Sequence, residues 1–233
     1  MLYGLPEGGQ PILLWRKDMS LSIMLSQLSV GMVRAVGIFA LTLLFSLPLG
    51  MLIAFARMSK NAIIKNIARV YISVLRGTPL MLQLLVVYFA PFYLWHANIS
   101  GYRFAAVIIG FSLNYAAYFA EIYRGGIQSI PQGQYEAAQV LGYSKSQTFF
   151  RIVLPQVVKN ILPAVTNEVI TLVKDTSLAF ALAYQEVFTL AKQIAAAQTN
   201  FIPFVVAAIF YYVFNVLVAF VMERIESKMD YYR

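Results

Sequence analysis

The stretch "AVGIFALTLLFSLPLGMLIAFA", Ala35–Ala56, carries no charged residue. An α-helix needs about 20 consecutive apolar residues to cross the hydrocarbon core of a bilayer, so this stretch predicts a membrane-spanning helix. Phe201–Met222 is also uncharged and predicts a second one, in which Tyr211 is expected to pack against lipid or another helix. The composition of the whole chain also indicates a membrane protein: 60% of its residues are hydrophobic, 12% are charged and the mean hydropathy is +0.70. A soluble domain has about 25% charged residues.

Three further segments predict spans, although polar residues interrupt each of them. Tyr71–Trp95 is apolar after its first turns, and Phe104–Tyr123 is broken only by Asn114 and Glu121. Ile161–Val187 is the least apolar of the five segments. A soluble core helix explains one such segment but not five in succession. The sequence therefore predicts an all-α integral membrane bundle of about five transmembrane helices.

Lysine and arginine residues favour one orientation of these spans, because cytoplasmic loops carry an excess of them. Twelve lie in the loop after the first span, the loop after the third span and the C-terminal tail: Arg57, Lys60, Lys65, Arg69, Arg76, Arg124, Lys145, Arg151, Lys159, Arg224, Lys228 and Arg233. Five lie on the other side: Arg16, Lys17, Arg34, Arg103 and Lys192. The larger group predicts an N-terminus outside the cell and a C-terminus in the cytoplasm.

The chain divides into a short N-terminal segment and one membrane domain. Residues 1–30 are expected to be extracytoplasmic, and residues 31–233 to form a single transmembrane domain. Asp18–Val33 mixes apolar residues with Ser and Gln, which fits an interfacial helix leading into the first span. Residues 1–15 lack the basic start and the cleavage site of a secretory signal.

The loop 124–160, between the third and fourth spans, has a soluble-looking helical sequence, "GQYEAAQVLGYSKSQTFFRIVLPQ" over Gly133–Gln156. Its first half is rich in helix formers, and Gly142 predicts a turn because glycine takes left-handed geometry cheaply. Helix is expected to resume after the turn, with Pro155 limiting how far it continues. On these residues alone, an amphipathic hairpin on the membrane and a docking element for a soluble partner are both open.

The spacing within this loop resembles a known family signature. Glu136-Ala137-Ala138, then Gly142, then Ile152-x-Leu154-Pro155 is similar to the EAA loop of ATP-binding cassette importer permeases. Three stretches resemble the polar amino acid branch of that family: "RGTPLMLQ" from Arg76, "NYAAYFAEIYRGGIQSIPQGQYEAA" from Asn114 and "NEVITLVKDTSL" from Asn167. The resemblance runs from about Gly31 to the C-terminus.

The resemblance implies a transmembrane subunit of a type I importer for amino acids. Such a subunit pairs with a second permease, itself or a sibling, binds two cytoplasmic ATPase subunits and receives substrate from an extracytoplasmic amino-acid-binding protein. The ATPase-coupling residues carried over by the resemblance are Glu136, Ala137, Ala138 and Gly142. The chain has no G-x-x-x-x-G-K-[ST] motif, so ATP and Mg are expected on the partner ATPase and no cofactor on this chain.

Charged residues of the fourth span are candidates for the substrate pathway, because a charge inside the membrane should face a cavity or a partner. Glu168 and Asp175 share one helix face and are candidates for contact with the ammonium group of an amino acid. Lys174 is a candidate to balance one of them or to meet a carboxylate. The alternatives are that these charges pair structurally across helices or between permease subunits, or that Glu168 lies in the cytoplasmic interface.

Polar groups of the second and third spans are weaker candidates for the same pathway. Thr78 and Gln83 flank Pro79, and irregular backbone at membrane depth is tolerated where it borders a cavity or other protein. Asn114 can bond substrate or another helix. Thr78 can instead bond back to its own helix. Glu121 and the following arginine, Arg124, are one turn apart and predict a structural salt bridge.

Other classes of function fit less well. A secondary transporter or a membrane scaffold that recruits a soluble protein remains open on the residues alone. An enzyme needs a nucleophile–base pair or a metal site, and the chain has one histidine, His96, and no cysteine. Metal binding and catalysis are therefore not expected. Basic residues follow the membrane-flanking loops, so nucleic-acid binding is not expected either.

Overall fold

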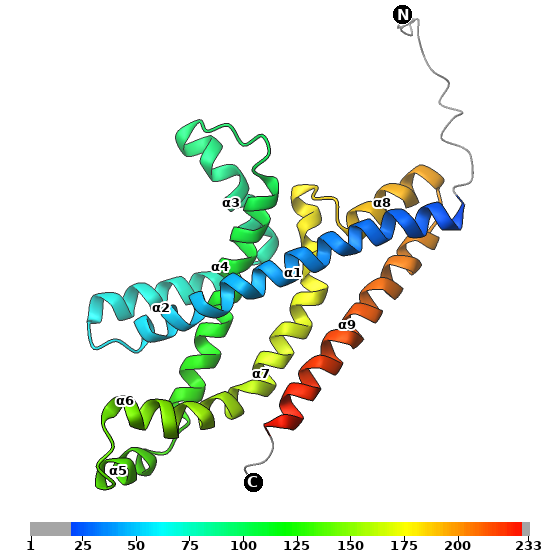
Figure 1. Ribbon diagram of the computed structural model, residues 1–233. Helices are drawn as coiled ribbons and strands as arrows, with labels where there is room; N and C mark the ends of the chain where they lie inside the picture. The colour runs from blue at the N-terminus through cyan, green and yellow to red at the C-terminus, as the bar shows by residue number, and fades with distance from the viewer. Residues whose placement is uncertain (1–19, 230–233) are drawn as a thin grey trace, which may run out of the picture.

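The computed structural model describes residues 20–229, and these are helical apart from short connections (Figure 1). The helices are α1 Leu21–Arg57, α2 Ala62–Gly77, α3 Leu80–Trp95, α4 Arg103–Gln128, α5 Gln132–Val140, α6 Lys145–Gln147, α7 Leu154–Asp175, α8 Val187–Gln198 and α9 Ile202–Lys228. A π-helical turn, Thr148–Val153, joins α6 to α7, and a 3₁₀ stretch, Thr176–Leu182, follows α7. The all-α prediction is confirmed for the described residues.

Three of the described helices, α1, α4 and α9, are long and apolar enough to cross a membrane. They contain the predicted spans 35–56, 104–123 and 201–222. A fourth span is possible if α2 and α3 count as one, although they meet at 113°. The predicted span 71–95 is therefore not a continuous helix: the chain bends at Thr78–Pro79, because Pro79 cannot donate to the preceding turn. Most of the predicted segment 161–187 lies in α7, which ends at Asp175.

Small residues let α1 and α4 cross closely, and this crossing forms the centre of the fold. The buried positions of α1 recur every three or four residues along one stripe: Met24, Leu28, Gly31, Ala35, Ile38, Thr42, Ser46, Gly50 and Ala54. A Cβ atom placed on Gly50 would lie 2.8 Å from the Phe119 Cβ and 3.1 Å from the Ala116 carbonyl oxygen of α4. Small residues favour such contacts between membrane helices because the backbones can approach.

The start of α1 differs from the expected interfacial helix. Residues 21–33 form the first turns of the same continuous helix as the span, because Met24 and Leu28 are buried in a cluster with residues of α8 such as Ala191. Arg16, Lys17 and the beginning of the expected interfacial helix lie outside the described residues.

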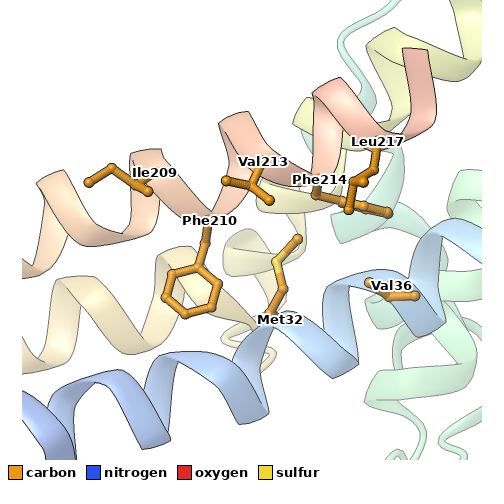
Figure 2. Close-up of a pocket in the computed structure, with 7 residues that line it drawn as sticks. All are labelled: Met32, Val36, Ile209, Phe210, Val213, Phe214 and Leu217. Atoms are coloured by element: carbon orange, nitrogen blue, oxygen red, sulfur yellow. The ribbon is translucent and has the colours of Figure 1, made fainter. Parts of the chain in front are cut away.

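The helix α9 lies beside α1 and α7, and its outward side is largely exposed. Phe39 of α1 and Phe214 of α9 make an edge-to-face contact with ring centroids 5.2 Å apart. Figure 2 shows an apolar pocket of about 350 Å³ beside this contact, lined from α1 by Met32 and Val36 and from α9 by Phe210, Val213 and their neighbours. Exposed apolar surface on a spanning helix faces lipid or another membrane subunit.

Different elements lie at the two ends of the bundle. In Figure 1, α5, α6, the start of α7 and the end of α9 gather at the lower end, whereas α8 and the beginnings of α1 and α9 lie at the other. The loop 124–160 is therefore on the same end as the last turn of α9.

Candidate functional site

The loop after α4 folds as helix, glycine turn and helix, as predicted. Helix α5 ends at Val140, and Gly142 takes a left-handed conformation with φ of +78°. The amide nitrogens of Gly142 and Tyr143 donate to the carbonyls of Gln139 and Ala138, both at 3.0 Å. These bonds satisfy carbonyls that a helix end leaves free. Ser144 then begins the next helix with a capping box to Gln147.

Pro155 does not limit the second helix, so that prediction is wrong. It lies in the first turn of α7, where the missing N–H of proline costs little. The preceding π-helical turn, Thr148–Val153, leads directly into α7. Backbone helix therefore runs from Lys145 to Asp175 and links the loop to α7, which carries the candidate pathway carboxylates.

The four residues carried over as ATPase-coupling residues have different surroundings. Ala138 is 1% exposed and packs within the loop. Glu136, Ala137 and Gly142 are exposed, and an added Cβ at Gly142 would meet nothing within 4 Å. Ala138 therefore supports the loop, while the other three are available to a partner.

Sequence reasoning missed that three large apolar residues of this loop are exposed. Val140 is 88% exposed, Leu141 72% and Phe150 64%. In the sequence, Val140 and Leu141 stand directly before the glycine turn and Phe150 stands eight residues after it. This pattern does not distinguish a hairpin that lies on the membrane from a docking site. We call Ala137, Val140, Leu141 and Phe150 the α5 surface. Exposed apolar surfaces of this kind mark interaction sites.

A polar network holds the bend between α2 and α3. The Gln83 amide nitrogen lies within hydrogen-bond distance of the Leu75 carbonyl at 2.9 Å and of the Thr78 carbonyl at 3.0 Å and hydroxyl at 2.8 Å. The Asn114 amide nitrogen donates to the Gln83 side-chain oxygen at 2.9 Å and to the Leu75 carbonyl at 3.1 Å. Thr78 donates back to the Val74 carbonyl. These contacts satisfy carbonyls freed at Pro79, which gives Thr78, Gln83 and Asn114 a structural task.

Replacing Asn114 by leucine is expected to destabilise the protein by about 1–3 kcal/mol, because the partly buried Gln83 side-chain oxygen loses this donor and the Leu75 carbonyl loses one of its two donors. The measurement is the midpoint of thermal unfolding in mild detergent. Asn167→Leu, at an exposed position of α7, is the matched control. Equal midpoints for both variants, together with reduced uptake in Asn114→Leu alone, would instead support direct contact of Asn114 with substrate.

Asp175 lies in a polar site between α7 and α4. The Tyr115 hydroxyl donates to its carboxylate at 2.8 Å. Tyr115 is 2% exposed, whereas Asp175 and Glu168 are only partly buried. The two carboxylates follow one face of α7, two turns apart, as predicted from their spacing. This part of α7 offers acceptors for a cationic group.

Lys174 does not join this group. It is exposed and lines a separate pocket of about 360 Å³ between the end of α7, α8 and α9, together with Ser177, Phe188, Tyr211 and other residues. Adjacent helix positions point about 100° apart, which separates Lys174 from Asp175.

The predicted ion pair of Glu121 and Arg124 is confirmed: the Arg124 Nε donates to both carboxylate oxygens at 3.1 Å. Arg76, the first residue of the stretch "RGTPLMLQ", lies over the Tyr118 ring with 5.1 Å from its guanidinium carbon to the ring centroid. The ion pair lies within α4, whereas the contact of Arg76 with Tyr118 joins the end of α2 to α4.

Three polar residues outside the predicted site also make buried contacts: Tyr115, Glu186 and Tyr211. Tyr211 was expected to pack against lipid or helices, but its hydroxyl donates to Glu186 at 2.7 Å. Glu186 could have been recognised as an N-cap before "VFTLAKQ", since a carboxylate suits that position. In the described residues, no group of three His, Cys, Asp or Glu side chains is arranged to hold a metal ion.

Comparisons with known proteins agree with this arrangement. Residues 46–231 match the family described as "Binding-protein-dependent transport system inner membrane component". The chain is 37% identical over 190 residues to a putative glutamine transport system permease protein of Rickettsia conorii, covering 81% of this chain and 86% of the relative. It is 36% identical to the L-cystine transport system permease protein TcyB of Bacillus subtilis over 208 residues, covering 88% and 87%.

Solved structures show the same fold. A chain of an amino acid ABC transporter determined with histidines superposes with a TM-score of 0.82 at 30% identity, covering 91% of this chain and 98% of that one. A chain of the MetNI methionine ABC transporter in an inward-facing conformation gives a TM-score of 0.70 at 19% identity, covering 91% and 99%. The second likeness concerns the fold alone.

Proposed function

This chain belongs to the family of binding-protein-dependent transport system inner membrane components and is the permease subunit of an ABC amino acid importer, and we propose that its α5 surface couples to the ATPase while α7 lines the substrate pathway. It is a multi-pass inner membrane protein. Hydrolysis of ATP belongs to a separate subunit, and permeases of this family typically bind no cofactor. The family assignment favours this function over a secondary transporter or a scaffold.

The proposed topology has five membrane segments: α1, the bent pair α2–α3, α4, α7 with its 3₁₀ extension, and α9. The N-terminus is outside and the C-terminus is in the cytoplasm. Two observations support this orientation. Twelve of the 18 lysines and arginines fall in the segments predicted to face the cytoplasm, three of them (Lys65, Arg69 and Arg76) within α2. Helices α5 and α6 and the end of α9 lie at the same end of the bundle (Figure 1).

The proposed coupling site is the loop 124–160. The observation that carries it is the exposed helix–glycine–helix unit whose second helix continues without a break into α7. A soluble ATPase subunit that grips the α5 surface can move α7 through this continuous backbone. Glu136, Ala137 and Gly142 lie at the contact in this proposal, and Ala138 supports it from within.

The proposed substrate site is the polar face of α7 around Asp175. Its carboxylate, oriented by the Tyr115 hydroxyl at 2.8 Å, meets the ammonium group that every amino acid carries. Glu168 extends the same face toward the cytoplasm. Gln83, Thr78 and Asn114 border the pathway by holding the bend at Pro79, and Lys174 lies on another face of α7, about 100° away from Asp175.

The proposed partners are a cytoplasmic ATPase, a second permease subunit and an extracytoplasmic amino-acid-binding protein. An ABC transporter complex with ATPase subunits is implied by the family and by the structural neighbours. The second permease is either another copy of this chain or a related subunit, and it would cover apolar surface that α9 exposes.

The substrate class is tested by uptake into proteoliposomes that contain the complete complex and its binding protein. The curated relatives are named for glutamine, L-cystine and arginine transport. We expect ATP-dependent accumulation of at least one of these three radiolabelled amino acids, and none without ATP. Accumulation that an ion gradient drives in the absence of ATP would contradict the proposal.

A further inference from the structure

Glu186 is a fully buried carboxylate whose hydrogen-bonding capacity is used up within the protein. Its exposed fraction is 0%. One oxygen accepts from the Phe188 amide and the Tyr211 hydroxyl, both at 2.7 Å, and the other from the Thr189 amide and hydroxyl, both at 2.8 Å. A carboxylate has about four lone-pair sites, so all of them are occupied. No site is left for a substrate.

These four bonds join two consecutive helices, α8 and α9. The two amides and the Thr189 hydroxyl belong to the first turn of α8, which Glu186 caps. The Tyr211 hydroxyl comes from α9, 25 residues further along the chain. An apolar side chain would fill the space at less cost, because burying a carboxylate is unfavourable unless every oxygen is bonded. Unlike an apolar side chain, the carboxylate accepts hydrogen bonds from both α8 and α9 and so connects the two helices in a defined geometry.

The helix α1 also packs against the chain at Glu186. A Cβ atom on Gly31 would lie 2.9 Å from the Val187 nitrogen and 3.0 Å from the Glu186 carbonyl carbon. One turn further on, Arg34 donates to the Gln185 carbonyl at 2.8 Å. The 3₁₀ stretch Thr176–Leu182 begins next to Asp175. The chain that follows this stretch is held at Gln185 by α1 and at Glu186 by α8 and α9.

We propose that Glu186, Thr189 and Tyr211, here called the Glu186 clamp, keep α8 and the adjoining half of α9 in one rigid unit throughout the transport cycle. Glu186 is then a positioning residue: it fixes the end of the 3₁₀ stretch that begins next to Asp175. The inference rests on the proposed function, because the stretch matters to transport only if Asp175 borders the pathway.

The distance between α8 and α9 tests this proposal directly. The chain contains no cysteine, so Gln193→Cys on α8 and Val216→Cys on α9, both exposed, can carry the only spin labels on this subunit. Pulsed electron paramagnetic resonance gives the distance in the complete complex, without nucleotide and trapped with ATP and vanadate. Tyr211→Phe removes the link to α9 but leaves the cap of α8. Tyr212→Phe, at the neighbouring exposed tyrosine, is the matched control.

We expect one unchanged distance in both states for the labelled parent and for Tyr212→Phe. Tyr211→Phe should show a second distance in at least one state, and its uptake should fall about tenfold while ATP hydrolysis continues, because it loses a hydrogen bond to a charged group. A single unchanged distance in Tyr211→Phe would overturn the clamp. So would a distance that differs between the two states in the labelled parent.

If Tyr211→Phe does not assemble, the labelled parent still tests the clamp. One unchanged distance in both states supports it, and a distance that differs between the two states overturns it. The distance measurement needs no substrate. If the distance supports the clamp while the proteoliposomes accumulate none of glutamine, cystine and arginine, the proposed substrate class is wrong and the clamp is still supported.

Discussion

Gly142→Val is expected to lower ATP-driven uptake by about ten- to thirtyfold, without loss of the protein from the membrane. Gly142 has a φ of +78°, and a β-branched residue in the left-handed region costs about 1–2 kcal/mol or more. If the backbone moves to relieve that strain, it breaks the two 3.0 Å hydrogen bonds that the Gly142 and Tyr143 amides donate at the end of α5. The α5 surface then no longer has a fixed position relative to α7.

Gly142→Asn separates this backbone effect from simple loss of space. Asparagine adopts left-handed geometry far more readily than valine, and no atom lies within 4 Å of a Cβ at this position. The asparagine variant should therefore keep most of the uptake, measured in the same proteoliposomes. Equal activity of the valine and asparagine variants would show that the turn geometry does not matter for coupling.

Asp175→Asn is expected to reduce uptake per assembled complex by about ten- to a hundredfold. A hydrogen bond to a charged group contributes about 1.5–3 kcal/mol, and the substrate ammonium would lose such a partner. The asparagine oxygen still accepts from the Tyr115 hydroxyl, which now lies 2.8 Å from the carboxylate. Assembly with the ATPase subunit and the thermal stability of the complex should therefore stay close to those of the parent.

The control for Asp175→Asn is Glu223→Gln, which removes a negative charge from an exposed position near the end of α9. It should transport at the parent rate. Normal uptake by a well-assembled Asp175→Asn complex would remove Asp175 from the substrate pathway and leave its bond to Tyr115 as a structural contact between α7 and α4.

Local sequence patterns predicted the features that depend on local physics. Ala35–Ala56 and Phe201–Met222 were recognisable as membrane spans because each is an uncharged apolar run long enough for a helix to cross a bilayer. The turn at Gly142 followed from the freedom of glycine to adopt positive φ. The pair Glu121–Arg124 followed from helical spacing. Each of these requires knowledge of only a few neighbouring residues.

Features that depend on distant contacts could not be predicted in this way. The bend at Thr78–Pro79 is stable because Asn114, from another helix, bonds the carbonyl of Leu75. Pro155 looked like a helix end because the π-helical turn before it leaves no mark in the sequence. Tyr211 looked like an apolar packing residue, and only the fold shows that it meets the carboxylate of Glu186.

The central claim is that a separate ATPase subunit contacts the α5 surface, and photo-crosslinking tests it most directly. A benzoylphenylalanine placed at Leu141, which is 72% exposed, reports what touches this surface in the complete complex. The same probe at Ile67 of α2, 66% exposed, is the control. We expect the Leu141 probe, and not the Ile67 probe, to crosslink to a subunit with a G-x-x-x-x-G-K-[ST] motif, identified by mass spectrometry. Crosslinks from Leu141 only to lipid or to a second permease, in a complex that still contains the ATPase, would contradict the account.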